Sequence, residues 1–266
     1  LIKDSVFIHE KNIEYLKSIG RKVTPLYTKP QMHQMFEHME YAPVSEKIKL
    51  NDNLTVVFHK NSHVIGATSI SLYIKKPNGT CKHILYSSDM GSKLNKDMQP
   101  FLWDSDMPTK CNLFISEATY NTKDRQFNKK DCVKEREELK ELIKNAIVEK
   151  RRILFATFSF SRSQLLMSML YDWFKDEDWF KEAPLVVDGY LVNNINSTYL
   201  NILEGEEREY FQKIMNMPNI RFNKTYDGTL ATLSQRTPGI YLASSGFLAN
   251  GRVTTYLPQF LGCSKD

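Results

Sequence analysis

The spacing of apolar positions changes along the chain, and it predicts helices first and strands later. Residues 1–18 and 32–39 place apolar side chains three and four positions apart, which is the spacing of one helix face. Thr28 and Gln31 precede the second stretch in the order of a capping box, so we expect a helix to begin there. Short apolar runs of strand length follow from residue 54 onwards, and they predict sheet in the rest of the chain.

The first half of the chain predicts paired strands. Residues 54–59, 69–74 and 83–86 are short runs rich in β-branched and aromatic side chains. The turn signal at residues 77–79, Pro-Asn-Gly, separates the last two runs. Residues 113–115 form a further short apolar run, which we expect to be a buried strand.

The second half alternates strands with helices. Continuous apolar runs that predict strands occur at residues 153–158, 184–187, 220–222 and 239–243. Such alternation is typical of a parallel, doubly wound sheet. We therefore predict an α/β protein whose first domain, residues 1–118, contains paired strands and whose second domain, residues 119–266, contains the parallel sheet. The first domain looks like half of an αββα sandwich.

Composition and charge narrow the class of protein. The chain has 266 residues, 41% of them hydrophobic, which argues against disorder. No apolar run reaches the roughly 20 residues of a membrane helix. The net charge of +5 permits a polyanionic partner without proving one. Four cysteines without a C-x-x-C spacing (Cys81, Cys111, Cys132 and Cys263) are interpreted as reduced thiols of a cytoplasmic protein that binds no membrane.

Three polar side chains stand where strands are expected to end. His63 follows the run 54–59, Asp89 follows 83–86, and Glu117 follows 113–115. An imidazole and a carboxylate together suit a divalent metal such as zinc. By spacing alone such a pair is more often two unrelated groups, and Glu117 can equally be an ordinary strand end. The other histidines lack ligand spacing and are interpreted as structural or surface residues (His9, His33, His38, His59 and His83).

Three turns in the second half of the chain follow predicted strands and carry residues suited to binding phosphate. Residues 159–162, 188–190 and 244–246 follow strands and carry serine, glycine or arginine. Ligands of open α/β sheets bind at this edge, and helix N-termini suit phosphate. The alternative is that these are ordinary caps and turns; Ser161 and Gln164 have the spacing of a second capping box.

Several short motifs follow one another along the chain: KDSVFIHEKNIEYL near the start, Pro25-Leu26-Tyr27-Thr28, SHVIGATSI with ILYSSDMG around His63 and Asp89, ISEATY around Glu117, FATFSFSRSQLL at 155–166, and the stretch from Leu242 to Arg252. They resemble, in the same order, the motifs of the β-CASP branch of the metallo-β-lactamase superfamily. The resemblance covers nearly the whole chain and is to the ribonucleases of that branch.

The resemblance implies a zinc-dependent ribonuclease. His63 would be a ligand of one zinc ion, Asp89 would bridge two ions, and Glu117 would be a catalytic group that orients a histidine. RNA would be the partner, and its backbone would lie against six residues of the second half. These expected RNA-binding residues are Ser161, Arg162, Ser244, Ser245, Gly246 and Arg252.

The chain also departs from the family pattern. Asn61 and Ser62 stand where the family has Ala-Gly, and Ser88 and Ser161 stand where it has glycine. The family's H-x-H-x-D-H cluster and its C-terminal histidine motifs are not found in the sequence. We therefore expect a central fragment of a longer enzyme, inactive alone and weak in metal binding.

Two alternatives stay open beside the ribonuclease. One is a nucleic-acid-binding paralogue without catalysis, and the other is a DNA nuclease of the same superfamily. A homodimer is also open.

Overall fold

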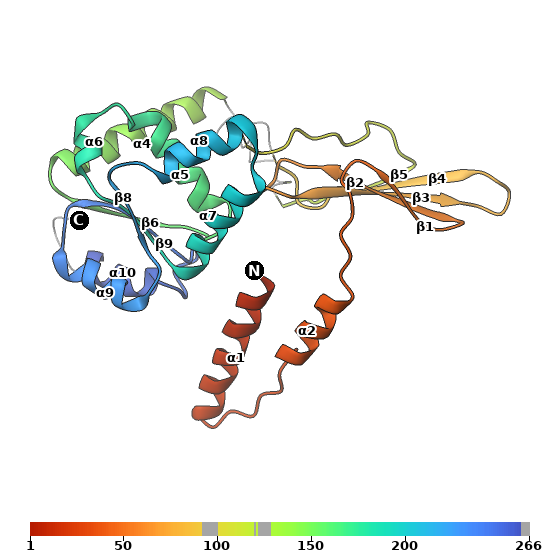
Figure 1. The fold of residues 1–266 in the computed structure, drawn as a ribbon, viewed down its shortest axis with the longest axis horizontal. Helices are drawn as coiled ribbons and strands as arrows, with labels where there is room; N and C mark the ends of the chain where they lie inside the picture. Colours follow the sequence, from red (N-terminus) through yellow and green to blue (C-terminus); the bar gives the residue numbers. More distant parts are fainter. Residues whose placement is uncertain (92–100, 120, 122–128, 262–266) are drawn as a thin grey trace. The chain divides into compact units, whose positions relative to one another are not determined.

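The computed structural model describes residues 1–91, 101–119, 121 and 129–261. The chain divides into two compact units, Leu1–Pro43 and Val44–Asp266 (Figure 1). No helix in the described ranges is both long and apolar enough to cross a membrane. Cys81, Cys111 and Cys132 are free thiols, and Cys263 lies outside the described residues.

The first unit consists of two helices, α1 (Ile2–Ser18) and α2 (Lys29–Glu37). Val6 and Ile13 of α1 and Met32 of α2 are its buried apolar side chains. The backbone N–H of Thr28 donates to Oε1 of Gln31 at 2.9 Å. This bond confirms the expected capping box, so local sequence sets where α2 begins.

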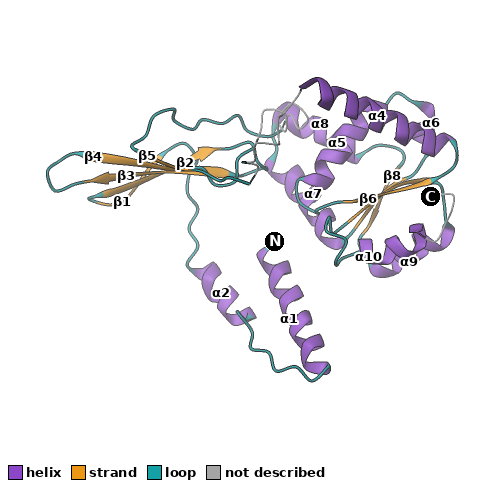
Figure 2. Cartoon of the chain, turned by 180° about the vertical axis from the view of Figure 1, so that it is seen from behind, coloured by secondary structure: helices purple, strands orange, loops and turns teal. Residues whose placement is uncertain are grey.

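The second unit begins with a five-stranded sheet in the order β1-β2-β3-β4-β5. Neighbours pair antiparallel from β1 to β4, whereas β4 and β5 are parallel; Figure 2 shows this sheet in orange. The strands are β1 (Lys47–Asn51), β2 (Leu54–Lys60), β3 (Thr68–Lys75), β4 (Cys81–Tyr86) and β5 (Leu113–Ile115).

The expectation that residues 113–115 form a buried strand is wrong in one respect. They are a strand, but Leu113, Phe114 and Ile115 are 51%, 47% and 47% exposed. The physical reason is position: among the described strands β5 is the last of its sheet, and its one neighbour is β4. The apolar side chains of β5 therefore do not indicate that this strand is buried among the described residues.

The rest of the unit is a four-stranded sheet in the order β6-β9-β7-β8. All three pairings are parallel, which confirms the predicted parallel α/β architecture. The strands are β6 (Arg152–Ala156), β7 (Leu185–Asp188), β8 (Ile220–Asn223) and β9 (Gly239–Ala243). The helices are α4 (Lys129–Val148), α5 (Arg162–Phe174), α6 (Asp178–Glu182), α7 (Tyr190–Ile202), α8 (Gly205–Met215), α9 (Tyr226–Gln235) and α10 (Val253–Leu261).

Side chains of the central strands alternate between two apolar clusters. Leu185 and Val187 point into a cluster that includes residues of α4, α5, α7 and α8. Val186 and Tyr241 point into a second cluster, shared with α9 and α10. Figure 1 shows these two groups of helices on opposite sides of the sheet. The alternation follows from the pleat of a strand, and it makes the sheet doubly wound.

One loop segment contributes to the core of the parallel sheet from outside its helices. Phe101 and Leu102 are 1% and 2% exposed and belong to its larger cluster. The ring of Phe101 makes edge contacts with Tyr199 and Phe211, at 5.5 and 5.8 Å between centroids. These side chains precede residue 118, where we expected the domain boundary, and the division there stays a prediction.

Candidate functional site

His63 and Asp89 lie together at one edge of the first sheet. The strands β2 and β4 flank β3 and both run antiparallel to it, so both end at the same edge. His63 lies in the loop after β2 and Asp89 in the loop after β4. Nε2 of His63 is 3.9 Å from Oδ2 of Asp89. Their side chains are 36% and 76% exposed, so both can be reached from solvent.

Glu117 joins this edge because β5 runs parallel to β4. Its Oε1 accepts from the backbone N–H of Met90 at 2.6 Å, and its Oε2 accepts from the Thr119 hydroxyl at 2.6 Å. The Thr119 bond, then the Met90 bond and, to a lesser extent, the nearby His63 hold the pKa of Glu117 below its usual value. Glu117 is therefore a carboxylate at neutral pH, fixed beside the loop that carries Asp89.

The ligand types at this edge fit zinc, but their number is incomplete. Imidazole nitrogen and carboxylate oxygen are ordinary zinc ligands, and a zinc site takes about four of them. Within the described ranges, no three histidine, cysteine, aspartate or glutamate side chains converge in a way that could hold an ion. Both oxygens of Glu117 already accept hydrogen bonds. His63 and Asp89 are thus two suitable zinc ligands, and they form part of a ligand set.

Ser161 stands at the start of α5, and its conformation overturns the second expected capping box. It takes φ 67°, and its side chain makes no capping hydrogen bond. A serine caps a helix from the extended region of backbone space, so the left-handed conformation turns the hydroxyl away. Nε2 of Gln164 instead donates to Oδ1 of Asn196 at 2.7 Å and to the Ser159 carbonyl at 3.2 Å. Arg162, the next residue, is exposed.

Ser244, Ser245 and Gly246 form a turn after β9. The N–H of Ser245 donates to the Asn250 carbonyl at 3.0 Å, and the N–H of Val253 donates to the Ser244 carbonyl at 2.7 Å. The turn therefore folds back on itself and leads into α10. The hydroxyl oxygen of Ser245 is buried and has no hydrogen-bond partner within the described ranges.

Arg252 is held by a buried carboxylate. Its Nε lies 3.5 Å from Oδ1 of Asp188, a residue that is 1% exposed at the end of β7. Asp188 also accepts from the Tyr256 hydroxyl at 2.6 Å, the Thr229 hydroxyl at 2.9 Å and Nδ2 of Asn223 at 3.1 Å. Burial, and then the bond to Asp188, raises the pKa of Tyr256. The side chain of Arg252 keeps 22% exposure.

Two exposed aromatic rings lie in the same turns as the predicted residues. Phe158 and Phe247 are 43% and 79% exposed, and their ring centroids are 5.1 Å apart with an edge-to-face orientation. Gly246 lets the rings pack closely, since a Cβ there would lie 3.2 Å from the ring of Phe158. Sequence reasoning missed this pair, although each phenylalanine lies inside a motif that it had marked.

His59 and His83 have the structural role that the sequence suggested. Nε2 of His59 and Nε2 of His83 each lie 2.8 Å from the hydroxyl of Ser71, which is fully buried in β3. Burial lowers the pKa of His59, and the nearby Asp106 partly opposes that shift. The side chains of His59, Ser71 and His83 thus form a row of hydrogen-bonded polar groups across strands β2, β3 and β4.

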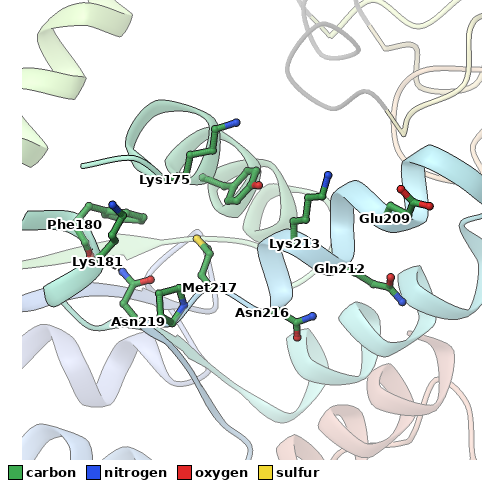
Figure 3. A pocket seen from close by; sticks show the side chains of 11 residues that line it. Lys175, Phe180, Lys181, Glu209, Gln212, Lys213, Asn216, Met217 and Asn219 are labelled. Atoms are coloured by element: carbon green, nitrogen blue, oxygen red, sulfur yellow. Dashed lines mark hydrogen bonds between the residues drawn. The ribbon is translucent and has the colours of Figure 1, made fainter. Parts of the chain in front are cut away.

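A separate hollow of about 500 Å³ lies beside α5, α6 and α8. Its walls include the lysines Lys175, Lys181 and Lys213, together with Phe180 and Met217 (Figure 3). None of the residues that the sequence marked as candidates lines it. It is therefore not the site predicted from the motifs.

Comparison with known proteins agrees with the motifs. Residues 163–266 match the Beta-Casp domain family. Endoribonuclease YSH1 of Eremothecium gossypii is 24% identical over 259 residues, which are 93% of this chain and 31% of that protein. Ribonuclease TTHA0252 of Thermus thermophilus is 22% identical, with 89% and 52% covered. Transcription termination factor FttA of Cenarchaeum symbiosum is 24% identical, with 87% and 36% covered.

This chain therefore spans about a third to a half of these relatives. The match to the first of these relatives covers 93% of the chain, so it includes the edge with His63, Asp89 and Glu117. Residues 163–266 resemble the Beta-Casp domain, and the chain is similar in sequence to proteins that are named as ribonucleases.

Proposed function

We propose that this chain takes part in zinc-dependent hydrolysis of RNA phosphodiester bonds, providing part of the metal site and the RNA-holding domain. The observation that carries the proposal is the convergence of His63, Asp89 and Glu117 at one sheet edge. Relatives that are named ribonucleases support it.

In this proposal His63 and Asp89 would hold zinc. Zinc would supply electrostatic stabilisation of the phosphodiester under attack. The remaining ligands would have to come from outside the described residues, which supply this one pair. Glu117, kept as a carboxylate by Met90 and Thr119, would orient a histidine ligand.

The turns that follow strands β6 and β9 of the parallel sheet would hold the RNA strand. Exposed Arg162 would meet phosphate, and Arg252 would present a guanidinium already oriented by Asp188. The hydroxyls and amides of the turns would add donors to the sugar-phosphate backbone. Phe158 and Phe247 would stack on bases, as exposed aromatic rings do for single strands. The remaining members of this proposed set are Ser161, Ser244, Ser245 and Gly246.

The direct test uses the complete protein and matched RNA and DNA strands, with and without a chelator. We expect RNA cleavage that the chelator abolishes. Asp89→Ala is expected to lower kcat by roughly a thousandfold or more, the order seen when a group central to the chemistry is lost. The control is Asp52→Ala, an exposed carboxylate in the β1–β2 turn that pairs only with Lys49 among the contacts described.

The outcomes separate the alternatives. Robust RNA cleavage by Asp89→Ala protein would contradict the mechanism. Binding of RNA without hydrolysis would favour a catalytically inactive paralogue. A clear preference for the DNA strand would favour a DNA nuclease.

The RNA-binding part is tested by affinity at several salt concentrations. Arg162→Ala is expected to weaken binding to all sequences and to reduce the slope of log K against log salt by about 1, because one phosphate contact is lost. Phe247→Ala is expected to weaken binding while leaving that slope unchanged, because stacking releases no counterions.

A further inference from the structure

We propose that Asn61 is a positioning residue that fixes the loop of His63 against the loop of Asp89. The inference rests on the proposed function, since it concerns the two residues assigned there to metal. Asn61 directly follows β2 and is 3% exposed. Its side chain therefore lies inside the protein, beneath the two loops.

The amide oxygen of Asn61 bridges both loops. Oδ1 accepts from the backbone N–H of His63 at 2.8 Å and from the backbone N–H of Gly91 at 3.2 Å. One acceptor thus receives a donor from each loop. A shift of either loop by about 1 Å would break one of these bonds, because hydrogen bonds weaken steeply beyond normal length.

The amide nitrogen holds the Asp89 loop from the same side. Nδ2 donates to the Asp89 carbonyl at 2.9 Å, to the Ser87 carbonyl at 3.3 Å and to the hydroxyl of Ser69 at 3.2 Å. Oxygen faces backbone N–H groups and nitrogen faces carbonyls, so the network itself fixes the amide orientation. A side chain that is this buried and this fully bonded holds one geometry.

Gly91 brings the loops close enough for this arrangement. A Cβ at Gly91 would overlap the carbonyl group of Ser62 and the amide nitrogen of His63. The backbone of the Asp89 loop therefore lies directly on the backbone that carries His63. Any other residue at 91 would push the loops apart and take its N–H away from Asn61.

Most of the hydrogen bonds of the Asn61 side chain serve these loops rather than the sheet. Its partners at residues 63, 87, 89 and 91 lie in the two loops, and only Ser69 belongs to a strand. Alanine, which the resembling family pattern has at this position, could form none of them. This chain uses a polar side chain to set the separation of its imidazole and carboxylate.

The experiment compares Asn61→Ala with Asn78→Ala. Asn78 is a matched control, because its Oδ1 also accepts from a backbone N–H, that of Thr80, but in the exposed β3–β4 turn. The first measurement is amide hydrogen exchange at His63 and Gly91 in the complete protein after metal has been removed with a chelator. We expect about tenfold faster exchange at both amides in Asn61→Ala, the order expected when a buried acceptor is lost, and no change in Asn78→Ala.

The second measurement uses the complete protein. Zinc affinity, by competition with a chelator, is expected to fall by about 10- to 100-fold in Asn61→Ala, as for other groups that orient ligands. The kcat for RNA is expected to fall by a similar factor with KM unchanged. Asn61→Asp keeps the acceptor oxygen, so the amides of His63 and Gly91 should both still exchange slowly. Residues 87–89 should exchange faster, because their carbonyls lose the Nδ2 donor.

The outcomes are distinguishable. Unchanged exchange at His63 and Gly91 in Asn61→Ala would overturn the proposal. Faster exchange with zinc affinity and kcat both unchanged would also overturn it, because Asn61 would then be structural only. If the wild-type protein cleaves no RNA, the proposed function fails, whereas exchange and zinc affinity still decide the role of Asn61.

Discussion

The two sheets of the second unit are stabilised in different ways. The parallel sheet is covered on both faces, and Leu185 and Val187 are completely buried in it. In the first sheet β5 is about half exposed, while the fully buried side chains include the serines Ser69 and Ser71. Of the described residues, those in the two large apolar clusters belong to the parallel sheet and its surroundings.

The difference indicates that the parallel sheet acts as a scaffold, whereas the first sheet carries the candidate metal-binding edge. Apolar packing gives the parallel sheet and its helices a core of their own, on which exposed turns can carry arginines and aromatic rings. The first sheet instead depends on hydrogen bonds between serine, asparagine and histidine side chains near its functional edge. Directional bonds fix relative positions more narrowly than apolar contact does. We expect substitutions in the two sheets to differ accordingly.

The largest effect should come from the apolar core. Leu185→Ala removes a fully buried side chain and should lower the free energy of unfolding by about 2–5 kcal/mol, because it leaves a cavity. The matched change Leu113→Ala, at a position 51% exposed, should cost less than about 1 kcal/mol. Urea unfolding followed by circular dichroism measures both. Equal losses would remove the contrast between the sheets.

A smaller effect is expected at the buried carboxylate. Tyr256→Phe removes one donor to Asp188 and should cost about 1–3 kcal/mol, because a buried acceptor loses a partner. Tyr190→Phe, at an exposed position, serves as the control and should stay within about 0.5 kcal/mol of wild type. Thermal unfolding of the wild type, Tyr256→Phe and Tyr190→Phe measures these losses of stability.

The first sheet should respond to pH through His59. Burial lowers the pKa of His59. As the pH falls, the unfolded chain therefore binds a proton at His59 more readily than the folded chain does. Stability is then full above the ordinary histidine pKa of about 6.5 and falls as the pH drops below it, by at most about 1.4 kcal/mol per pH unit. Urea midpoints at pH 7.5 and 5.5 should differ less in His59→Gln than in wild type. His33→Gln should keep the wild-type difference.

The smallest effect on stability is expected on β5. Phe114→Ser, at a position 47% exposed, should change the free energy of unfolding by less than about 0.5 kcal/mol. It should nevertheless reduce self-association, because exposed apolar edge strands promote pairing between chains. Light scattering over a range of concentrations measures this. A large loss of stability would show that β5 is covered in solution.

Patterns of spacing predicted the architecture well. Alternating strands and helices after residue 118 indicated a parallel sheet, since each crossover between parallel strands needs a helix. The convergence of His63 and Asp89 was predicted from motifs, and it follows physically from β2 and β4 ending at one edge. Strand order is what brings these loops together, and local spacing alone does not contain it.

The failures have equally specific causes. The run at residues 113–115 is apolar, but its burial depends on what covers an edge strand, which local sequence does not encode. Ser161 and Gln164 have the spacing of a capping box, yet φ 67° at Ser161 reflects the preceding turn. Asn61 was noted as a departure from the family pattern, but its contact with Gly91 was not predicted, because that contact joins residues far apart in the chain and leaves no periodic signal.

The burial of Phe101 and Leu102 has a consequence for how the second unit unfolds. Both side chains are anchored in the core of the parallel sheet, and the segment that carries them continues into β5 and Glu117. Melting that core would release the anchor and loosen the strand that positions the glutamate. Heat should therefore disrupt the sheet edge that carries His63, Asp89 and Glu117 and the parallel sheet in a single cooperative transition.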